Sequence, residues 1–454
     1  MKKMILVLIL MMIGLAACNE GYSQGYYVNY SSYENYAADE DYEVYDCEYN
    51  YEYTSEYEAL TGFVDDAIVF IEFVEGAHPI FVMPEILPQD YYERRDEFVQ
   101  AAQEAESHLD FYFAMMQYLT VLRDEHMSMM GFTLLSNYYL DTELIARDNR
   151  LFLLADGEVT LEVVKVGEIP VKLVLETIDM YFYHENEAAR NRTHAVMARG
   201  KEMLQRAGAE FGQDTATITL EDGEVHIAQV VENTAWRLKG IVGSNEREFI
   251  INYGMINDDV FLVDVRTFQD DPGFIRAERD IRRAVNEGVR YFVFDVRNNT
   301  GGNSSLAWGL LNAMGITPPS FGSVVRGRSA LNPEQPEIAV KSPPSLRATN
   351  NPNDVIIAVL TNANTLSSAR WVSAWVQDGD LGVVIGEPGA NAGTAFGNLA
   401  ARAILPYTQL RVSSSTHRWI RPDAYADQST IWPDIYVPHE EALVAALEFF
   451  ANID

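Results

Sequence analysis

The sequence is poor in cysteine and in positive charge. Only two of its 454 residues are cysteines, Cys18 and Cys47, so cysteine thiolates cannot build a metal cluster. Lys and Arg total 33 against 67 Asp and Glu, which gives a formal net charge of −34. This balance argues against binding to nucleic acid, or to anionic lipid through basic patches, and it favours solubility.

Long apolar runs are also lacking beyond the N-terminus. Lys2 and Lys3 precede an apolar stretch at 4–15, which is typical of an export signal and too short to span a bilayer comfortably. The following Leu15-Ala16-Ala17-Cys18 resembles the bacterial lipobox, in which the cysteine is lipidated. We therefore expect a lipoprotein signal peptide at 1–17 and a mature protein tethered to the outer face of the bacterial cell membrane through Cys18. A plain signal peptide with a chance cysteine is the alternative.

Residues 18–57 have no pattern that would build a core. The stretch 19–57 holds twelve tyrosines among acidic and polar residues, with no Lys or Arg. Repulsion between carboxylates and the shortage of aliphatic side chains predict an extended, disordered tether. If Cys18 carries the lipid, Cys47 has no partner for an intramolecular disulfide.

The rest of the chain divides into three regions by its apolar pattern. Helical periodicity predicts an N-terminal helical domain at 58–145. Short strands around a long polar helix, at about 185–207, predict a mixed insert at 146–245. From 246 to 454 strands alternate with helices, which predicts a largely parallel α/β layer. A chain of this length is expected to hold more than one domain.

Two segments of the predicted α/β layer have the residues that acyl transfer needs. An apolar run ending at Asp295 leads to Gly301 and Gly302, whose backbone amides can approach a ligand closely. A second apolar run leads to Ser367, at the start of a predicted helix. Because functional loops lie at the carboxyl ends of parallel strands, an oxyanion-binding loop and a nucleophilic serine are expected there.

A serine nucleophile needs a base, and the eight histidines of the chain are the natural candidates. His126 is distinguished by its position after an amphipathic helix, on a turn that we expect to enter a strand. His417 is an alternative base. Ser368 is likewise an alternative to Ser367 as the nucleophile.

Several of these segments, taken in order, resemble the serine peptidase family of the C-terminal processing (tail-specific) peptidases and the tricorn core. The family strand Asp-Leu-Arg-x-Asn-x-Gly-Gly is similar to 295–302, and its Leu-x-Asp-x-His turn is similar to 122–126. The Ile-Gly-Glu-x strand corresponds to 385–388, and Pro-Asp-Ile-x-Val corresponds to 433–437. The resemblance implies a crotonase/ClpP-like catalytic core, with a PDZ-like or degenerate insert in the mixed region.

The resemblance also implies roles for individual residues. Ser367 would be the nucleophile, and the amides of Gly301 or Gly302 and of Ser368 would form the oxyanion hole. The processing peptidases use a lysine as the base, at a place that falls at Ala392 here, but no lysine follows Lys341. The tricorn-like arrangement, with His126 as the base and Asp427 behind it, is therefore the expected triad.

The sequence thus predicts an exported, membrane-anchored bacterial serine peptidase that cuts peptides or unfolded protein tails without a metal or cofactor. The main alternative is a binding protein that keeps the peptidase fold and takes small hydrophobic ligands or peptides. An esterase using the same serine is a third possibility. The sequence carries no indication of the oligomeric state.

Overall fold

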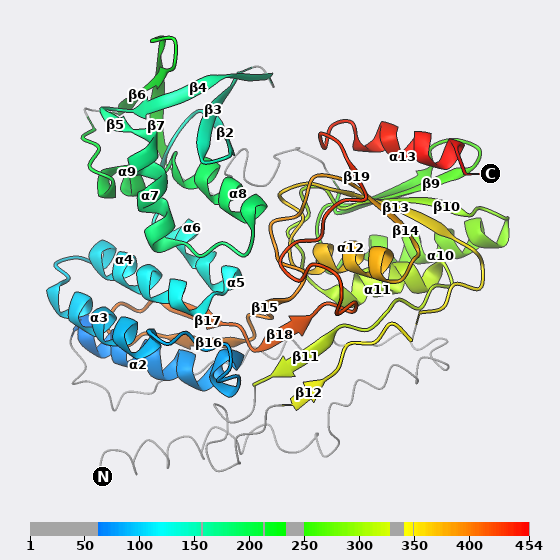
Figure 1. Ribbon diagram of the computed structural model, residues 1–454, viewed down its shortest axis with the longest axis horizontal. Helices are drawn as coiled ribbons and strands as arrows, with labels where there is room; N and C mark the ends of the chain where they lie inside the picture. Colours follow the sequence, from blue (N-terminus) through cyan, green and yellow to red (C-terminus); the bar gives the residue numbers. More distant parts are fainter. Residues whose placement is uncertain are drawn as a thin grey trace.

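The computed structural model describes residues 62–155, 158–211, 214–232, 249–326, 340–347 and 349–453. The predicted signal peptide, Cys18 and the tether lie outside these residues, so their predictions are not tested. Within the described ranges, none of the helices combines the length and apolar character needed to cross a bilayer. Figure 1 shows a helical layer and a mixed sheet region beside an α/β core.

The N-terminal region is helical, as its apolar periodicity predicted. Phe70, Phe98 and Tyr118 from three helices meet in its core, each at most 2% exposed. Prolines interrupt the chain between α2 and α3, and Ser107 caps α4 by accepting a hydrogen bond from the Asp110 amide. The elements are α2 (Phe63–Ala77), η1 (Pro79–Val82), α3 (Tyr91–Glu104), α4 (His108–Leu119), η2 (Thr120–Leu122), α5 (Glu125–Ser128) and α6 (Met130–Leu134).

The mixed region holds an antiparallel sheet covered by helices. The sheet runs in the order β1-β7-β6-β4-β3-β2, with β5 paired to β4. Its strands are β1 (Tyr138–Leu140), β2 (Glu143–Arg147), β3 (Arg150–Ala155), β4 (Glu158–Val166), β5 (Ile169–Pro170), β6 (Thr215–Leu220) and β7 (Val225–Glu232), and its helices are α7 (Val171–Tyr181), α8 (Glu187–Met197) and α9 (Lys201–Arg206). We call this region the insert.

Two sequence-based details of these regions are wrong. The long helix expected at about 185–207 is two helices, because Gly200 adopts an extended conformation and bridges Tyr139 of β1. His126 does not lie on a turn that enters a strand. It lies in α5, which is followed by α6 before the first strand begins at Tyr138.

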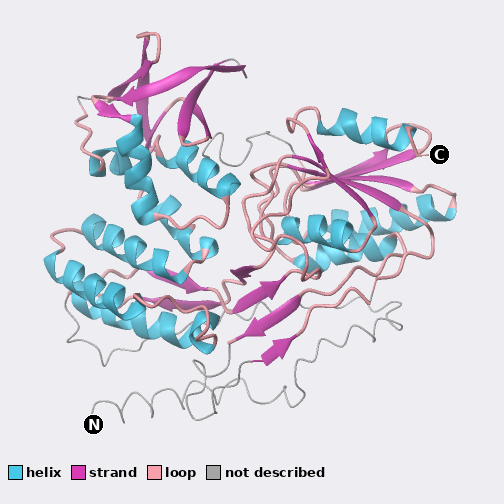
Figure 2. Cartoon of the chain, viewed as in Figure 1, coloured by secondary structure: helices cyan, strands magenta, loops and turns pink. Residues whose placement is uncertain are grey.

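The C-terminal part is the predicted α/β layer. Its sheet runs β19-β14-β13-β10-β9-β8, and only the β8–β9 pair is antiparallel. Helices α10, α11 and α12 cover one face and α13 covers the other, as Figure 2 shows. The elements are β8 (Ile251–Met255), β9 (Val260–Val265), α10 (Pro272–Asn286), β10 (Tyr291–Asp295), α11 (Ser304–Ala313), β13 (Ile356–Thr361), α12 (Ser368–Asp378), β14 (Gly382–Gly386), β19 (Ile435–Tyr436) and α13 (Ala442–Ala451).

Two further sheets join the α/β core to the N-terminal helices. One runs β12-β11-β18-β15, and the other is the hairpin β16–β17. The hairpin packs against α2, and Asp66 of that helix accepts hydrogen bonds from the Tyr407 and Thr408 amides at 2.7 and 2.8 Å. The strands are β11 (Gly322–Val325), β12 (Val340–Ser342), β15 (Ala395–Gly397), β16 (Ala401–Ile404), β17 (Arg411–Ser414) and β18 (His417–Ile420).

Candidate active site

The two polar segments singled out in the sequence meet at one edge of the α/β sheet, because β10 and β13 are neighbouring parallel strands. The Asn298 amide donates to Asn362 Oδ1 at 3.0 Å, and Asn362 Nδ2 donates back to Asn298 Oδ1 at 2.9 Å. The Leu366 amide donates to the Asn299 carbonyl at 2.9 Å. The expectation that both segments lie at the carboxyl ends of parallel strands is confirmed, and the structure adds that the two strands are neighbours.

Ser367 occupies a strained backbone position at the start of α12. Its φ of 50° and ψ of −120° are unusual for a residue with a side chain, and such a conformation costs about 1–3 kcal/mol. Among the described residues its hydroxyl has no hydrogen-bond partner, whereas the Ser368 hydroxyl donates to the Gly302 carbonyl at 2.6 Å. This difference favours Ser367 over Ser368 as the reactive serine.

Gly301 of the glycine pair packs directly against the serine. A Cβ on Gly301 would lie 2.6 Å from the Cβ of Ser367, so a side chain cannot be accommodated without movement. The Gly301 amide donates to Asn299 Oδ1 at 2.8 Å, while the Gly302 amide has no acceptor among the described residues. Of the predicted oxyanion-hole donors, Gly302 and Ser368 at the first turn of α12 therefore have the freer amides.

His126 lies buried in α5, where Asp124 caps the helix. Asp124 Oδ1 accepts the His126 amide at 2.8 Å and lies 3.9 Å from His126 Nδ1. Burial lowers the pKa of His126, and the positive charge of Arg370 lowers it further, although Asp124 opposes both. The imidazole is therefore neutral at neutral pH, as a proton acceptor must be.

Asp124 is itself held in place by a second histidine. His78 Nε2 lies 3.1 Å from Asp124 Oδ2, and both side chains are fully buried. Burial alone would raise the pKa of Asp124, but the hydrogen bond with His78 outweighs it, so this pKa lies below its usual value. Asp124 is therefore ionised next to the ring of His126.

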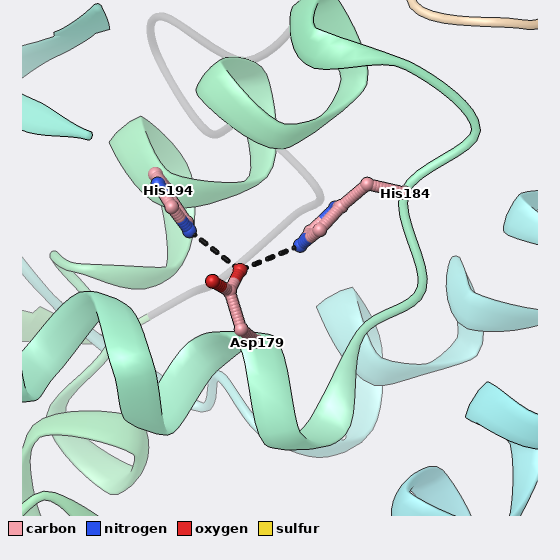
Figure 3. A group of neighbouring side chains, drawn as sticks. All are labelled: Asp179, His184 and His194. Atoms are coloured by element: carbon pink, nitrogen blue, oxygen red, sulfur yellow. Dashed lines mark hydrogen bonds and ion pairs between the residues drawn. The ribbon is translucent and has the colours of Figure 1, made fainter. Parts of the chain in front are cut away.

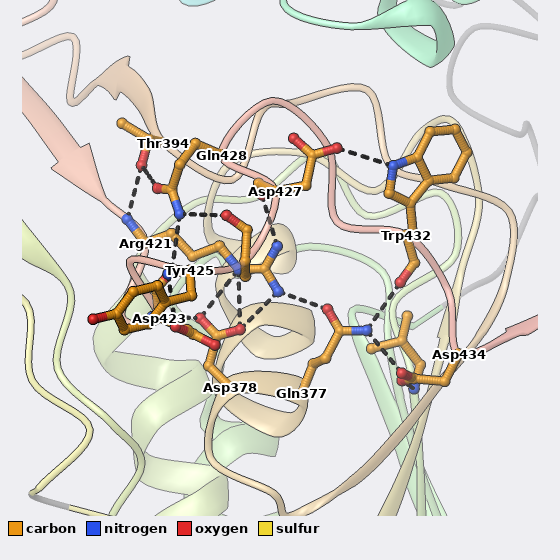
Figure 4. A network of polar contacts seen from close by, with 12 residues as sticks. Gln377, Asp378, Thr394, Arg421, Asp423, Tyr425, Asp427, Gln428, Trp432 and Asp434 are labelled. Carbon is orange, nitrogen blue, oxygen red and sulfur yellow. Dashed lines mark hydrogen bonds and ion pairs between the residues drawn. The ribbon is translucent and has the colours of Figure 1, made fainter.

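Asp427, the predicted third member of the triad, lies on an exposed loop. Its carboxylate accepts hydrogen bonds from the Ser429 amide and hydroxyl and from Trp432 Nε1, all within the same loop. Figure 4 shows that the loop is fixed to α12 by Arg421, which contacts buried Asp378 at 2.7 Å. No hydrogen bond or ion pair joins Asp427 to His126 among the described residues, and the role of Asp427 stays a prediction.

Two residues near the site were not singled out in the sequence. Glu185, between α7 and α8, accepts hydrogen bonds from the Ala392 amide at 2.8 Å and from Asn391 Nδ2 at 3.2 Å. Asn391 Oδ1 in turn accepts the Ser367 amide at 2.6 Å. Asn391 stands in the short 389–394 segment where a lysine is missing, but Glu185 belongs to the insert and had no signal in the sequence.

These residues connect the predicted base to the predicted nucleophile. A carboxylate oxygen of Glu185 and a ring nitrogen of His126 lie within 4.8 Å of each other. From Glu185 the contacts continue through Asn391 to the Ser367 amide. His126 and Ser367 share no direct hydrogen bond among the described residues. Both are linked to the hydrogen-bonded pair of Glu185 and Asn391, His126 by its distance to Glu185 and Ser367 by its hydrogen bond to Asn391.

His417, the alternative base, has a different environment. Its Nδ1 lies 3.0 Å from Asn398 Nδ2 and 2.9 Å from the Thr416 hydroxyl, and its ring stacks on Trp419. Burial lowers its pKa to about 4. Within the described residues it makes no hydrogen bond to Ser367, and its role as the alternative base stays a prediction.

A cluster of Asp179, His184 and His194 has a residue composition that can bind a metal (Figure 3). Both histidines direct Nε2 at Asp179 Oδ1, at 3.0 and 2.7 Å. However, Arg190 donates to both oxygens of the same carboxylate. Since this guanidinium already neutralises the only anion of the cluster, the arrangement is better explained as an ion-pair network that ties α7 to α8.

A cavity of about 630 Å³ adjoins Glu185. Its walls come from the N-terminal helices, the segment before α8 and the β15–β18 sheet, and they combine apolar side chains with two arginines. The lining includes Ile80, Ile86, Arg123, Tyr183, Phe396 and Arg418. The size and the mixed lining suit a peptide segment or a small organic ligand.

Comparison with known proteins shows which family part of this chain resembles. Residues 259–437 match the model of Peptidase family S41. The solved structure of mature CPAF complexed with lactacystin aligns over 86% of this chain and 96% of its own, with 15% identity and a TM-score of 0.56. A structure of mature CPAF aligns over 86% and 95%, with 14% identity and a TM-score of 0.53. A search of curated proteins gave no match.

At these identities the solved structures establish the fold alone. They share it over both the α/β core and the regions that precede it, since the alignments cover most of each chain. The family match spans the strand ends that hold the glycine pair and Ser367. Together they confirm the predicted resemblance to the C-terminal processing peptidases, and the similarity to peptidase family S41 lies in the α/β core of this chain.

Proposed function

We propose that this protein is an exported serine peptidase, lipid-anchored through Cys18, that hydrolyses peptides or unfolded protein tails. The observation that carries the proposal is the state of Ser367. Its backbone is strained, its hydroxyl has no hydrogen-bond partner among the described residues, and it lies against the glycine pair. Strain of this kind is found where neighbouring groups hold a residue for function. The S41 match supports a peptidase rather than another hydrolase.

In the proposed reaction, Ser367 Oγ attacks the peptide carbonyl carbon while its proton passes to neutral His126. The developing oxyanion accepts hydrogen bonds from the amides of the glycine pair and Ser368. The C–N bond then breaks as His126 returns the proton to the leaving amine, which leaves an acyl-enzyme on Ser367. Water then attacks the acyl carbonyl carbon while His126 takes its proton. The ester bond to Ser367 breaks as His126 returns the proton to Ser367 Oγ, and the carboxylic acid is released.

An aspartate completes the proposed triad by orienting the imidazole and stabilising its protonated form. The resemblance indicates Asp427 for this role. The 3.9 Å separation between Asp124 Oδ1 and His126 Nδ1, together with the burial of both residues, favours Asp124 instead. The two assignments are separable by substitution, because Asp124 and Asp427 lie on different elements and share no contact among the described residues.

Labelling with a fluorophosphonate tests the nucleophile. We expect one adduct, located by peptide mass spectrometry at Ser367, absent in Ser367→Ala and retained in the matched control Ser368→Ala. An adduct on another serine would reassign the nucleophile. Absence of both labelling and peptide hydrolysis in the folded protein would contradict the proposal.

The second candidate is a binding protein that keeps the peptidase fold. The cavity beside Glu185 favours it, because its apolar walls could hold a small hydrophobic ligand without any chemistry. This function would be supported if the wild-type protein hydrolysed neither peptides nor esters but bound an apolar fluorescent probe saturably. Phe396→Ser, which changes a residue of the cavity wall, should then weaken the binding of the probe. Hydrolysis of esters but not of peptides would instead indicate an esterase.

The proposed anchor has its own test. Cells fed a radiolabelled fatty acid should label the wild-type protein but not Cys18→Ser, and the variant should be released from the membrane fraction. Cys47→Ser serves as the control, since it removes the other cysteine and leaves the lipobox-like segment intact. Equal labelling of Cys18→Ser would exclude this anchor.

A further inference from the structure

The insert contacts the α/β core at the loops that hold Ser367. Asn186 Nδ2 donates to the carbonyls of Gly389 and Asn391 at 3.0 and 3.2 Å. Arg192 Nε donates to Asn364 Oδ1 at 3.1 Å, just before the serine. Beneath these contacts Ala189 of α8 packs with Leu366 and Ala390 in a small buried apolar cluster. The two loops around the nucleophile are therefore braced by the insert.

Glu185 is the buried carboxylate of this contact. Its Oε2 accepts both the Ala392 amide and Asn391 Nδ2, while its Oε1 is buried without a hydrogen-bond partner among the described residues. An amide side chain has its donor and its acceptor on opposite branches. By holding Nδ2 of Asn391, Glu185 fixes the direction of Asn391 Oδ1, which accepts the Ser367 amide at 2.6 Å.

We propose that Glu185 is a positioning residue for catalysis, which acts through Asn391 to hold Ser367 in its reactive conformation. The inference rests on the proposed function, since it takes Ser367 as the nucleophile. A backbone at φ 50° relaxes unless its surroundings hold it, and the bond from Asn391 is a direct restraint on the Ser367 amide. Glu185 belongs to the insert, so the insert contributes to the chemistry and not only to substrate capture.

Glu185 also makes the site sensitive to pH. The groups around it are His126 and Asp124 at the start of α5, Glu125, the Arg370 guanidinium of α12, and Tyr183. Burial raises the pKa of Glu185 to about 7, although the Ala392 amide and Arg370 oppose the shift. Ionised Glu185 is the better acceptor for Asn391 and also stabilises a protonated His126. Activity should therefore rise as the pH increases through this pKa.

The test is steady-state peptide hydrolysis by Glu185→Ala, Glu185→Gln and the matched control Glu187→Gln, an exposed glutamate two residues away. We expect Glu185→Ala to lower kcat by about 10² with KM little changed, as misplacement of a reacting group does. Glu185→Gln keeps an acceptor oxygen, so it should lose less and should lack the pH step near 7. A wild-type kcat and pH profile in both Glu185 variants, with Ser367→Ala inactive, would overturn this proposal alone.

A double-variant cycle tests the route through Asn391. If Glu185 acts only through this side chain, Glu185→Ala combined with Asn391→Ala should be no slower than the slower single variant. If the two single-variant losses in kcat instead multiply in the double variant, Glu185 does not act through Asn391. The Glu185→Gln variant keeps the test decisive should an alanine variant fail to fold. Activity persisting in Ser367→Ala would mark failure of the proposed function instead.

Discussion

The two halves of the molecule hold their parts of the candidate site by different means. In the α/β core, Ser367 and the glycine pair are fixed by hydrogen bonds between loops that follow adjacent strands. In the N-terminal half, His126 and Glu185 belong to a buried cluster of ionisable groups. We call the hydrogen-bonded loops that hold Ser367 and the glycine pair the core frame. The groups of the core frame do not titrate, whereas the N-terminal half contributes groups whose charge changes with pH.

The family match follows the same division. It spans 259–437 and so covers the core frame, while His126, Asp124 and Glu185 lie before it. In the N-terminal half burial and neighbouring charge act together, since Glu125 has a pKa well above its usual value through burial and through Glu185. We therefore expect substitutions in the core to cause losses that are independent of pH, and substitutions in the N-terminal half to change the pH dependence.

Replacing the nucleophile should have the largest effect. We expect Ser367→Ala to lower kcat by at least about 10⁴, the scale seen when a triad serine is removed, at every pH. Its thermal midpoint should stay close to that of the wild type, because the hydroxyl has no hydrogen bond among the described residues to lose. Ser368→Ala is the control. If Ser367→Ala kept more than a tenth of the wild-type kcat, the core would not supply the nucleophile.

Replacing the base should come next. We expect His126→Gln to lower kcat/KM by about 10³, within the range for loss of a general base, while His417→Gln stays near wild type. The pH profile carries the distinguishing information. A base must be neutral, and burial lowers the pKa of His126, so the limb due to this base should lie below about 6.5, the ordinary pKa of histidine. Equal losses in both variants would contradict the assignment.

The core frame was the part most accessible from the sequence. Continuous apolar runs such as Phe292-Val293-Phe294 predict strands buried on both faces, and all three side chains are fully buried. Parallel pairing of β10 and β13 then brings Gly301 and Ser367 to the same edge. Each step needs only local periodicity and one rule of sheet topology, which explains why this part of the prediction is confirmed.

The charged cluster was not accessible in the same way. Glu185 is a polar residue between two helices, and nothing in its neighbourhood distinguishes it from a solvated glutamate. Its role depends on contacts with Asn391 and Ala392, more than two hundred positions further along the chain. The break at Gly200 escaped prediction for a related reason, because the bridge to Tyr139 that accompanies it is a tertiary contact.

A glycine comparison measures how tightly the core frame is packed. Gly301 and Gly223 both have positive φ, of 100° and 89°, but only Gly301 faces a close neighbour, the Cβ of Ser367 at 2.6 Å. We expect Gly301→Ala to lower kcat by about 10², because the serine must move. Gly223→Ala, in the β6–β7 turn of the insert, should pay only backbone strain of about 1 kcal/mol in unfolding free energy and leave kcat unchanged. Similar kcat values for the two variants would show that the frame is not rigid.

The smallest effect is expected at Asp427. Its carboxylate is exposed and hydrogen-bonded within its own loop, so Asp427→Asn should change kcat by less than about threefold, as substitutions outside the catalytic contacts do. Asp124→Asn should cost much more, because it removes the ionised group beside His126 and the partner of His78. A loss in Asp427→Asn as large as that in His126→Gln would restore Asp427 as the third member of the triad. The orienting carboxylate would then come from the core, and the separation between a frame that does not titrate and a half that does would fail at that residue.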